Sequence, residues 1–196
     1  GAGLWYNIGE IIACHGESPR RMSKDAALLG AGPMEGNMET NLCANCFAGL
    51  TASGGKCPVC GWDNSTPQPP EALGCHTVVA SRYQVGRVKA QNGEGITYAA
   101  LDLTTQKLVE LREFFPAALA QRAEDGTAAP RSGKESLFDQ YLDDFIDLAK
   151  NVSRLREVTV VHSVLDIFEE NYTAYAVYEY VPSVTLGRYL ENSGGS

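Results

Sequence analysis

Four cysteines stand in two C-x-x-C pairs, Cys43 with Cys46 and Cys57 with Cys60. Each two-residue gap lets both thiolates of a pair face one ion, and the loop between the pairs can bring all four around Zn²⁺. Four protein ligands leave no open coordination position, so the spacing predicts a structural zinc site rather than a catalytic one. The alternative is two redox-active dithiols, but no βαβ pattern surrounds either pair.

The segment that holds these cysteines, residues 41–64, resembles a zinc ribbon, with Pro58 and Gly61 shaping its second turn. It is too short to bury enough apolar surface to fold alone, so we expect metal binding to stabilise it. Residues 65–78 form a Pro-rich linker. Residues 1–40 are a leader to which we assign no fold; Met34 and Met38 are candidate natural starts, so we interpret part of the leader as added sequence.

Alternating apolar residues beyond the linker predict strands, and a three- to four-residue apolar spacing predicts one main helix. The expected strands span residues 83–88, 96–101, 107–114, 160–169 and 173–181, the helix spans 137–155, and 117–134 is expected to be a loop. The fold class is therefore α+β: a small zinc ribbon followed by a five-stranded antiparallel sheet with one main helix.

Composition limits the possible functions. The 196 residues carry a formal net charge of -8 and are 44% hydrophobic, which fits a modest globular domain plus a small module. Nucleic-acid binding depends on clustered Lys and Arg, and Lys56 is the one basic residue in the ribbon, so we do not expect it. No apolar run reaches the length of a membrane span, and we expect a cytoplasmic protein.

Several blocks between residues 69 and 196 resemble bacterial serine/threonine protein kinases. The blocks are PPEAL, RYQVGRV, GITYAALDLTT, REFFP, LAQRAEDGT, FEENYTAYAVYEYV and TLGRYLENSGG. The resemblance implies that residues 79–196 form the small lobe (N-lobe) of a kinase, cut before the large lobe (C-lobe). Several members of that family also carry a zinc ribbon ahead of the kinase domain. The resemblance implies ATP with Mg²⁺ as the ligand of such a lobe.

The family's glycine-rich loop, G-x-G-x-x-G, has its glycines at Ala90, Asn92 and Gly95 of this chain. Two of the three glycines are absent, although Gly93 keeps the turn flexible. Glu94 brings a carboxylate toward the place of a triphosphate, and like charges repel. The loop therefore matches the family in position but disfavours phosphate binding.

Other positions that the resemblance assigns to nucleotide binding also differ. Arg112 stands where the family's V-A-I-K strand has its phosphate-contacting lysine, and Leu148 stands where a helix glutamate would pair with that lysine. Arg is not equivalent to Lys, because its planar fork has a different reach. Tyr178 falls at the gatekeeper position, and Glu179 and Val181 follow it in the hinge.

These differences predict a pseudokinase-like regulatory or protein-interaction module that binds structural zinc and binds ATP weakly or not at all. Its expected partner is another protein or the C-lobe of the same polypeptide. The catalytic and metal-binding loops of a kinase have no counterpart in the chain, so we do not expect catalysis from this chain alone. Two alternatives stay open: the N-terminal fragment of an active kinase, and a nucleic-acid-binding ribbon on a scaffold domain.

Overall fold

The computed structural model describes residues 41–51, 54–154 and 163–181. Nearly all of these belong to one compact unit, Glu39–Tyr180; of the other unit, Gly1–Met38 with Val181–Ser196, only Val181 is described. The leader and the last part of the expected N-lobe therefore lie outside the described residues. Within the described part of the chain, no helix is both long and apolar enough to cross a membrane.

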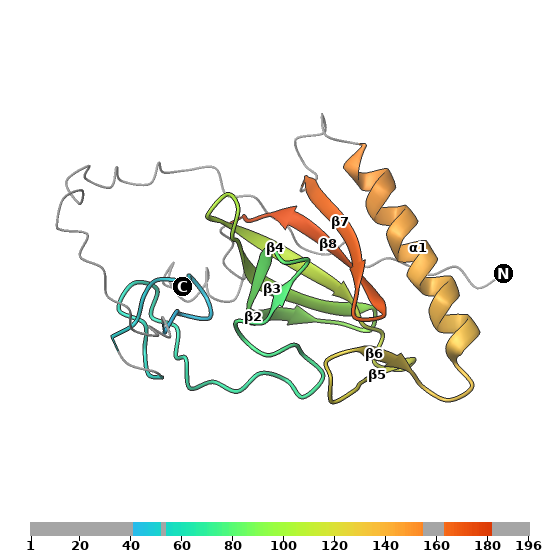
Figure 1. Ribbon diagram of the computed structural model, residues 1–196, viewed down its shortest axis with the longest axis horizontal. Coiled ribbons are helices and arrows are strands. Elements are labelled where there is room, and N and C mark those ends of the chain that lie inside the picture. Colours follow the sequence, from blue (N-terminus) through green and yellow to red (C-terminus); the bar gives the residue numbers. More distant parts are fainter. Residues whose placement is uncertain (1–40, 52–53, 155–162, 182–196) are drawn as a thin grey trace, which may run out of the picture. The chain divides into compact units, whose positions relative to one another are not determined.

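An antiparallel sheet with the strand order β1-β2-β3-β4-β8-β7 forms the centre of the unit (Figure 1). The strands are β1 (Val78–Val79), β2 (Tyr83–Gln91), β3 (Gly95–Asp102), β4 (Lys107–Phe114), β7 (Val164–Glu170) and β8 (Thr173–Glu179). Five of them overlap the ranges that the apolar alternation predicts; residues 160–162 of the strand expected at 160–169 lie outside the described residues. The sixth, β1, has two residues, too few to produce a period-two pattern in the sequence.

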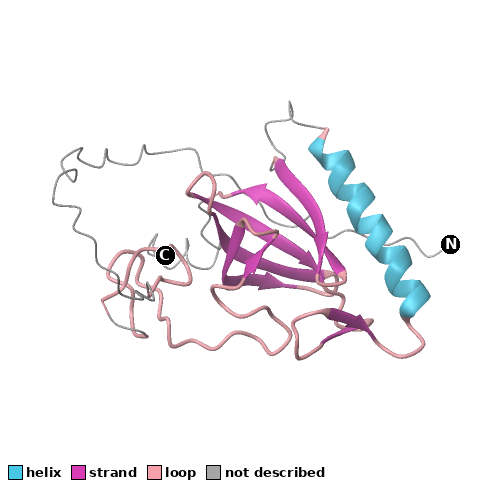
Figure 2. Ribbon diagram, viewed as in Figure 1, coloured by secondary structure: helices cyan, strands magenta, loops and turns pink. Residues whose placement is uncertain are grey.

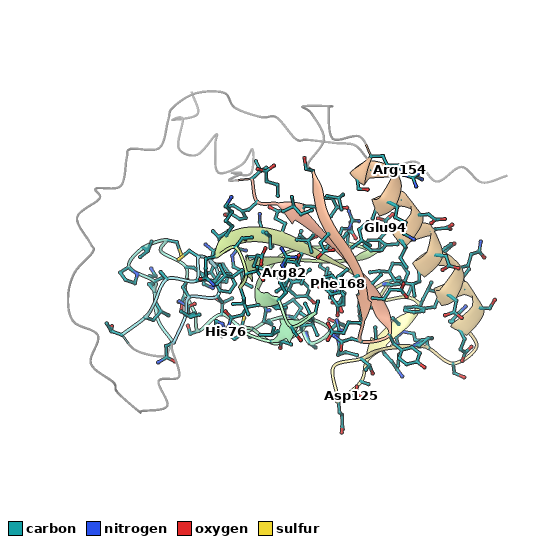
Figure 3. The ribbon with its side chains drawn as sticks, turned by 45° about the horizontal axis from the view of Figure 1, so that its top comes forward. His76, Arg82, Glu94, Asp125, Arg154 and Phe168 are labelled. Atoms are coloured by element: carbon teal, nitrogen blue, oxygen red, sulfur yellow. The ribbon has the colours of Figure 1, made fainter. Side chains whose placement is uncertain are left out.

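The segment expected to be a loop, residues 117–134, contains a short hairpin of β5 (Ala120–Arg122) and β6 (Ala128–Pro130). Asp125 lies at its tip (Figure 3), where its side chain accepts hydrogen bonds from the backbone N–H and the hydroxyl of Thr127. Gly126 adopts a φ of 88°, which glycine tolerates without strain. Strands of three residues carry too little alternation to be predicted.

The helix α1 (Glu135–Ser153) lies beside the sheet (Figure 2) and contacts β7 and β8. Phe138, Ile146 and Ala149 are its buried residues, at the spacing expected for one apolar face. The ring of Phe138 lies 5.3 Å from that of Phe114 at the end of β4. This contact ties the helix to the sheet, and the helix begins two residues earlier than the apolar pattern indicates.

The sheet has two faces that differ in composition, and strand register assigns residues to them because directly opposed residues share a face. The core face carries Tyr98, Val109, Leu111, Glu113, Tyr175 and Val177. The second face carries Thr97, Ala99, Glu110, Arg112, Ala176 and Tyr178. Adjacent residues Arg112 and Glu113 of β4 therefore point to opposite sides of the sheet.

Glu113 is a fully buried carboxylate on the core face, and its partners come from three other parts of the fold. Arg122 of β5 donates to both carboxylate oxygens, each at 2.7 Å. The hydroxyls of Tyr98 and Tyr175 donate to the same carboxylate at 2.7 and 3.1 Å. Burial and the negative charge of Glu113 raise the pKa of both tyrosines, so both remain protonated donors.

Candidate functional site

The four cysteines predicted as ligands lie together. Their Sγ atoms are all within 4.8 Å of one another, with Cys43 to Cys60 at 3.6 Å and Cys46 to Cys57 at 3.7 Å. A zinc–sulfur bond of about 2.3 Å in a tetrahedral site gives sulfur–sulfur separations of about 3.8 Å. The four thiols therefore form a cluster that could hold one metal ion.

The two knuckles that carry the cysteines have matching backbone geometry. Phe47 N–H donates to the carbonyl of Cys43 at 2.9 Å, and Gly61 N–H donates to the carbonyl of Cys57 at the same distance. Phe47 and Gly61 both have positive φ, at 57° and 73°. Each turn thus closes on its own first cysteine, which keeps both sulfurs of a pair on one side. In the first knuckle, Asn45 N–H also donates to Cys43 Sγ at 3.4 Å.

Two thiols of the cluster have shifted acidities. Burial raises the pKa of Cys46 to about 12, and hydrogen bonding to the other thiols adds to this shift. The pKa of Cys60 is lowered to about 7: burial opposes the shift, but hydrogen bonds from the Asn45 side chain and the Trp62 backbone outweigh it. A bound cation would add an electrostatic attraction that favours the thiolate form of the ligands.

Arg112 lies on the second face of the sheet and pairs with Glu94 of the β2–β3 turn. Its Nη2 donates to Glu94 Oε2 at 2.8 Å, and the two side chains are 32% and 51% exposed. The resemblance in the sequence assigns both residues to positions near the phosphates of a kinase ligand. The structure brings them together, so the guanidinium of Arg112 is hydrogen-bonded to the carboxylate of the turn.

The β2–β3 turn itself is closely held. The side-chain oxygen of Asn92 accepts hydrogen bonds from the N–H groups of Glu94 and Gly95, both at 3.0 Å. The carbonyl of Glu94 accepts from Phe115 N–H at 3.1 Å. A Cβ at Gly95 would lie 2.1 Å from the carbonyl oxygen of Glu113, so only glycine fits there. Gly93 has open space around it, and Ala90 is exposed at the end of β2.

A second ion pair lies on the same face of β4, two residues before Arg112. Lys89 of β2 bonds to Glu110, and both side chains are 17% exposed. The two strands are separated by β3, whose Ala99 is opposite Glu110 and is fully buried. The ammonium of Lys89 also lies 4.7 Å from the centre of the Tyr180 ring, within reach of a cation–π contact.

The remaining residues assigned to the nucleotide position lie on β8, just after it, and on α1. Tyr178 is opposite Glu110 in the register, and burial raises the pKa of its hydroxyl against the opposing effect of Arg112. Glu179 ends β8 and is exposed, as is Val181. Leu148 lies on α1 with 49% of its side chain exposed, and its apolar side chain can form no ion pair with Arg112.

Lys89, Glu110 and Tyr180 were not identified as site residues from the sequence. Glu110 takes the alanine position of the V-A-I-K strand, so the sequence alone shows that a charged residue stands there. The sequence does not show that Lys89 is its partner, because Lys89 lies two strands away and the bulges in β2 obscure which of its side chains lie on the second face. Ala44 and Asn45 of the first knuckle were missed as well, since their role depends on contacts with β2.

Comparison with known proteins bears on the fold of the chain. No family model matches the chain, and no curated protein matches it. Among solved structures, the chain is similar to PpkA-294 in its apo form, a bacterial serine/threonine kinase, with 25% identity and a TM-score of 0.55. The match covers 62% of this chain and 43% of that one, so the chain spans less than half the length of this relative. The chain therefore has a kinase-like fold and a four-cysteine cluster suited to a metal ion.

Proposed function

We propose that this chain is a zinc-binding, pseudokinase-like module from the N-terminal part of a bacterial serine/threonine kinase-like protein. It acts in regulation or protein interaction and binds ATP weakly or not at all. The proposal is supported chiefly by two ion pairs on the second face of the sheet, Lys89–Glu110 and Arg112–Glu94.

Arg112 stands at the position of the phosphate-contacting lysine. A nucleotide bound as in a kinase would lie against the face that this side chain shares with Glu110 and Tyr178. Both carboxylates of the ion pairs project on that face, and a triphosphate would have to displace Glu94 from Arg112. Displacement would leave Glu94 near the phosphates, where like charges repel.

The base end of such a site is also changed. Glu110 is opposite Ala99 in the register and pairs with Lys89, and Ala99 is fully buried, so the small residue does not offer an apolar surface to a ligand. Opening that surface would separate two partly buried charges, which costs free energy because each would lose its partner. Both ends of the nucleotide position thus contain groups that compete with the ligand.

Calorimetric titration with Mg·ATP tests this part of the proposal, with thermal denaturation as a second readout. We expect no binding heat and no shift in midpoint for the natural sequence. A variant that combines Glu94→Gly, Glu110→Ala and Arg112→Lys serves as the matched comparison, and we expect any nucleotide affinity to rise relative to the natural chain. A clear micromolar isotherm for the natural chain would contradict the proposal.

For the cysteine cluster we propose one structural Zn²⁺, held by Cys43, Cys46, Cys57 and Cys60. The all-thiolate donor set is one that zinc prefers, and it leaves no position for a substrate. Metal analysis should find about one zinc per chain. Cys46→Ser should lose the metal, whereas Cys75→Ser, which removes a half-buried thiol outside the cluster, should retain it.

The alternative is that the longer protein is an active kinase. It is supported by the similarity to a serine/threonine kinase and by the partial exposure of Arg112, which leaves its guanidinium reachable. Incubation of the longer protein with labelled ATP and a generic protein substrate distinguishes the two. Phosphate incorporation that disappears in Arg112→Ala would support the kinase, and none with any metal would remove it.

A further inference from the structure

The outer edge of β2 is closed in part by the short strand β1 and in part by segments that are not strands. Strand β1 pairs with Tyr83 and Gln84, at the beginning of β2. Farther along, the side chain of Gln68 in the linker accepts a hydrogen bond from Val88 N–H at 2.9 Å and donates one to the Gly86 carbonyl at 3.1 Å. Between these two groups, Arg87 N–H donates to the carbonyl of Ala44 at 2.7 Å. Ala44 lies within the first cysteine knuckle.

The local shape of β2 fits this contact. The register moves from Val85 opposite Ala100 to Val88 opposite Tyr98, so β2 has one extra residue and bulges at Gly86–Arg87. A Cβ on Gly86 would lie 2.3 Å from the Ala44 oxygen and 2.8 Å from the Phe47 ring. The glycine therefore permits the knuckle to approach the strand, and the bulge turns the Arg87 N–H toward it.

Arg87 contacts both cysteine knuckles. Its Nε donates to the side-chain oxygen of Asn45, between Cys43 and Cys46, at 2.6 Å. Its guanidinium carbon lies 4.4 Å from the centre of the Trp62 ring, two residues after Cys60. A single side chain on the sheet thus touches the segments on both sides of the cluster.

We propose that Arg87 couples metal binding in the cysteine cluster to the order of the β2 edge, so that each stabilises the other. The inference rests on the proposed metal site. Without metal the ribbon has too little buried surface to hold Ala44 and Asn45 in place, so the N–H and the guanidinium of Arg87 lose these partners. Arg87 is a positioning residue in this scheme, since it acts through Asn45 and Trp62 and does not ligate the metal.

Coupling between two sites is reciprocal, which provides a test with two independent readouts. In the first, metal affinity is measured by competition with a chromogenic chelator under reducing conditions. Arg87→Ala should weaken zinc affinity by about fivefold or more, within the usual range of such couplings. The matched control is Arg131→Ala, whose side chain donates to the Ala117 carbonyl on an exposed surface, and its zinc affinity should equal that of the natural chain.

In the second readout, amide hydrogen exchange is compared with and without zinc. Removal of zinc should speed exchange at Arg87, whose N–H bonds to Ala44 of the knuckle, and leave Leu111, in the central strand β4, unchanged. Should Arg87→Ala fail to fold, Arg87→Lys keeps the charge but loses the forked geometry, and it should give a smaller loss of zinc affinity.

The outcomes separate this inference from the proposed metal site. If the purified chain binds no metal, the metal site itself is wrong. If zinc binds but Arg87→Ala has the natural affinity, or Arg87 stays protected in the metal-free chain, the coupling is overturned and the metal site stands.

Discussion

Two neighbouring residues of β4, Arg112 and Glu113, carry opposite charges and face opposite sides of the sheet, and their surroundings differ in every respect. Glu113 is fully buried and receives four hydrogen bonds from a guanidinium and two tyrosines. Arg112 is partly exposed and pairs with a half-exposed carboxylate on a turn. On the core face the charge is a fixed part of the fold, whereas on the second face the charged side chains remain partly exposed.

The largest loss of stability is expected from a substitution on the core face. Arg122→Ala would leave the carboxylate of Glu113 buried without its counter-charge, and we expect a loss of about 3–5 kcal/mol in the free energy of unfolding. Denaturant unfolding measures this, with Arg131→Ala as a surface control. The double change Glu113→Gln with Arg122→Met removes both charges and should cost less than Arg122→Ala; a larger loss in the double variant would contradict the account.

The second largest loss of stability is expected at Asp102, and its size should depend on pH. Arg82 donates two hydrogen bonds to Asp102 at the end of β3 and, with Thr105 and the Thr104 N–H, holds the pKa of that carboxyl well below its usual value. The folded-state pKa is lower than the unfolded one of about 3.9, so the contribution is full above that pH and is lost as pH falls through the folded value.

The corresponding variant is Asp102→Asn, which keeps the shape of the side chain and removes its charge. We expect a loss of about 1.5–3 kcal/mol at pH 7, the range for hydrogen bonds to charged groups. The difference from the natural chain should shrink as pH falls below about 4. A difference that stays constant down to pH 2 would show that the charge of Asp102 contributes nothing.

Breaking the ion pair Lys89–Glu110 should cause an intermediate loss in the free energy of unfolding. Lys89→Met keeps the length of the side chain but removes the charge, and we expect a loss of about 1 kcal/mol because the pair is only partly buried. Thermal or denaturant unfolding reports the change. A loss as large as that of Arg122→Ala would mean that the second face is as fixed as the core face, and the contrast between the two would fail.

The smallest change in stability is expected from a substitution of Arg112. Arg112→Gln should change the free energy of unfolding by roughly 0.5 kcal/mol or less, because exposed ion pairs are weak and are screened by salt. The change should become smaller in high salt. Stability measured at low and high ionic strength tests this, with Glu94→Gln as the matched variant; a salt-independent loss above about 1 kcal/mol would contradict it.

The sequence predicted much of the fold because the longer strands and α1 carry clear periodicities, and the cysteine spacing predicted the cluster. It did not predict β1, β5 and β6, which are too short to show a pattern. Glu113 would be taken for an exposed residue, since nothing in REFFP indicates that Arg122, nine residues later, folds back onto it. The same limit applies to Lys89 and Glu110, whose pairing depends on the bulges of β2 and on the small size of Ala99.

The hydrogen bonds around Glu113 also have a consequence for how the chain folds. Tyr175 is 62 residues from Glu113 in the sequence, and Arg122 donates to the carbonyl of Glu71, 51 residues before it. Arg122 and Tyr98 lie only nine and 15 residues from Glu113, but the bonds to Tyr175 and to Glu71 join distant segments, so the entropy of closing long loops must be lost before the cluster is complete. We therefore expect Glu113 to be desolvated late, after β8 and the linker have arrived. Substitutions at this cluster should mainly speed unfolding and leave the folding rate little changed.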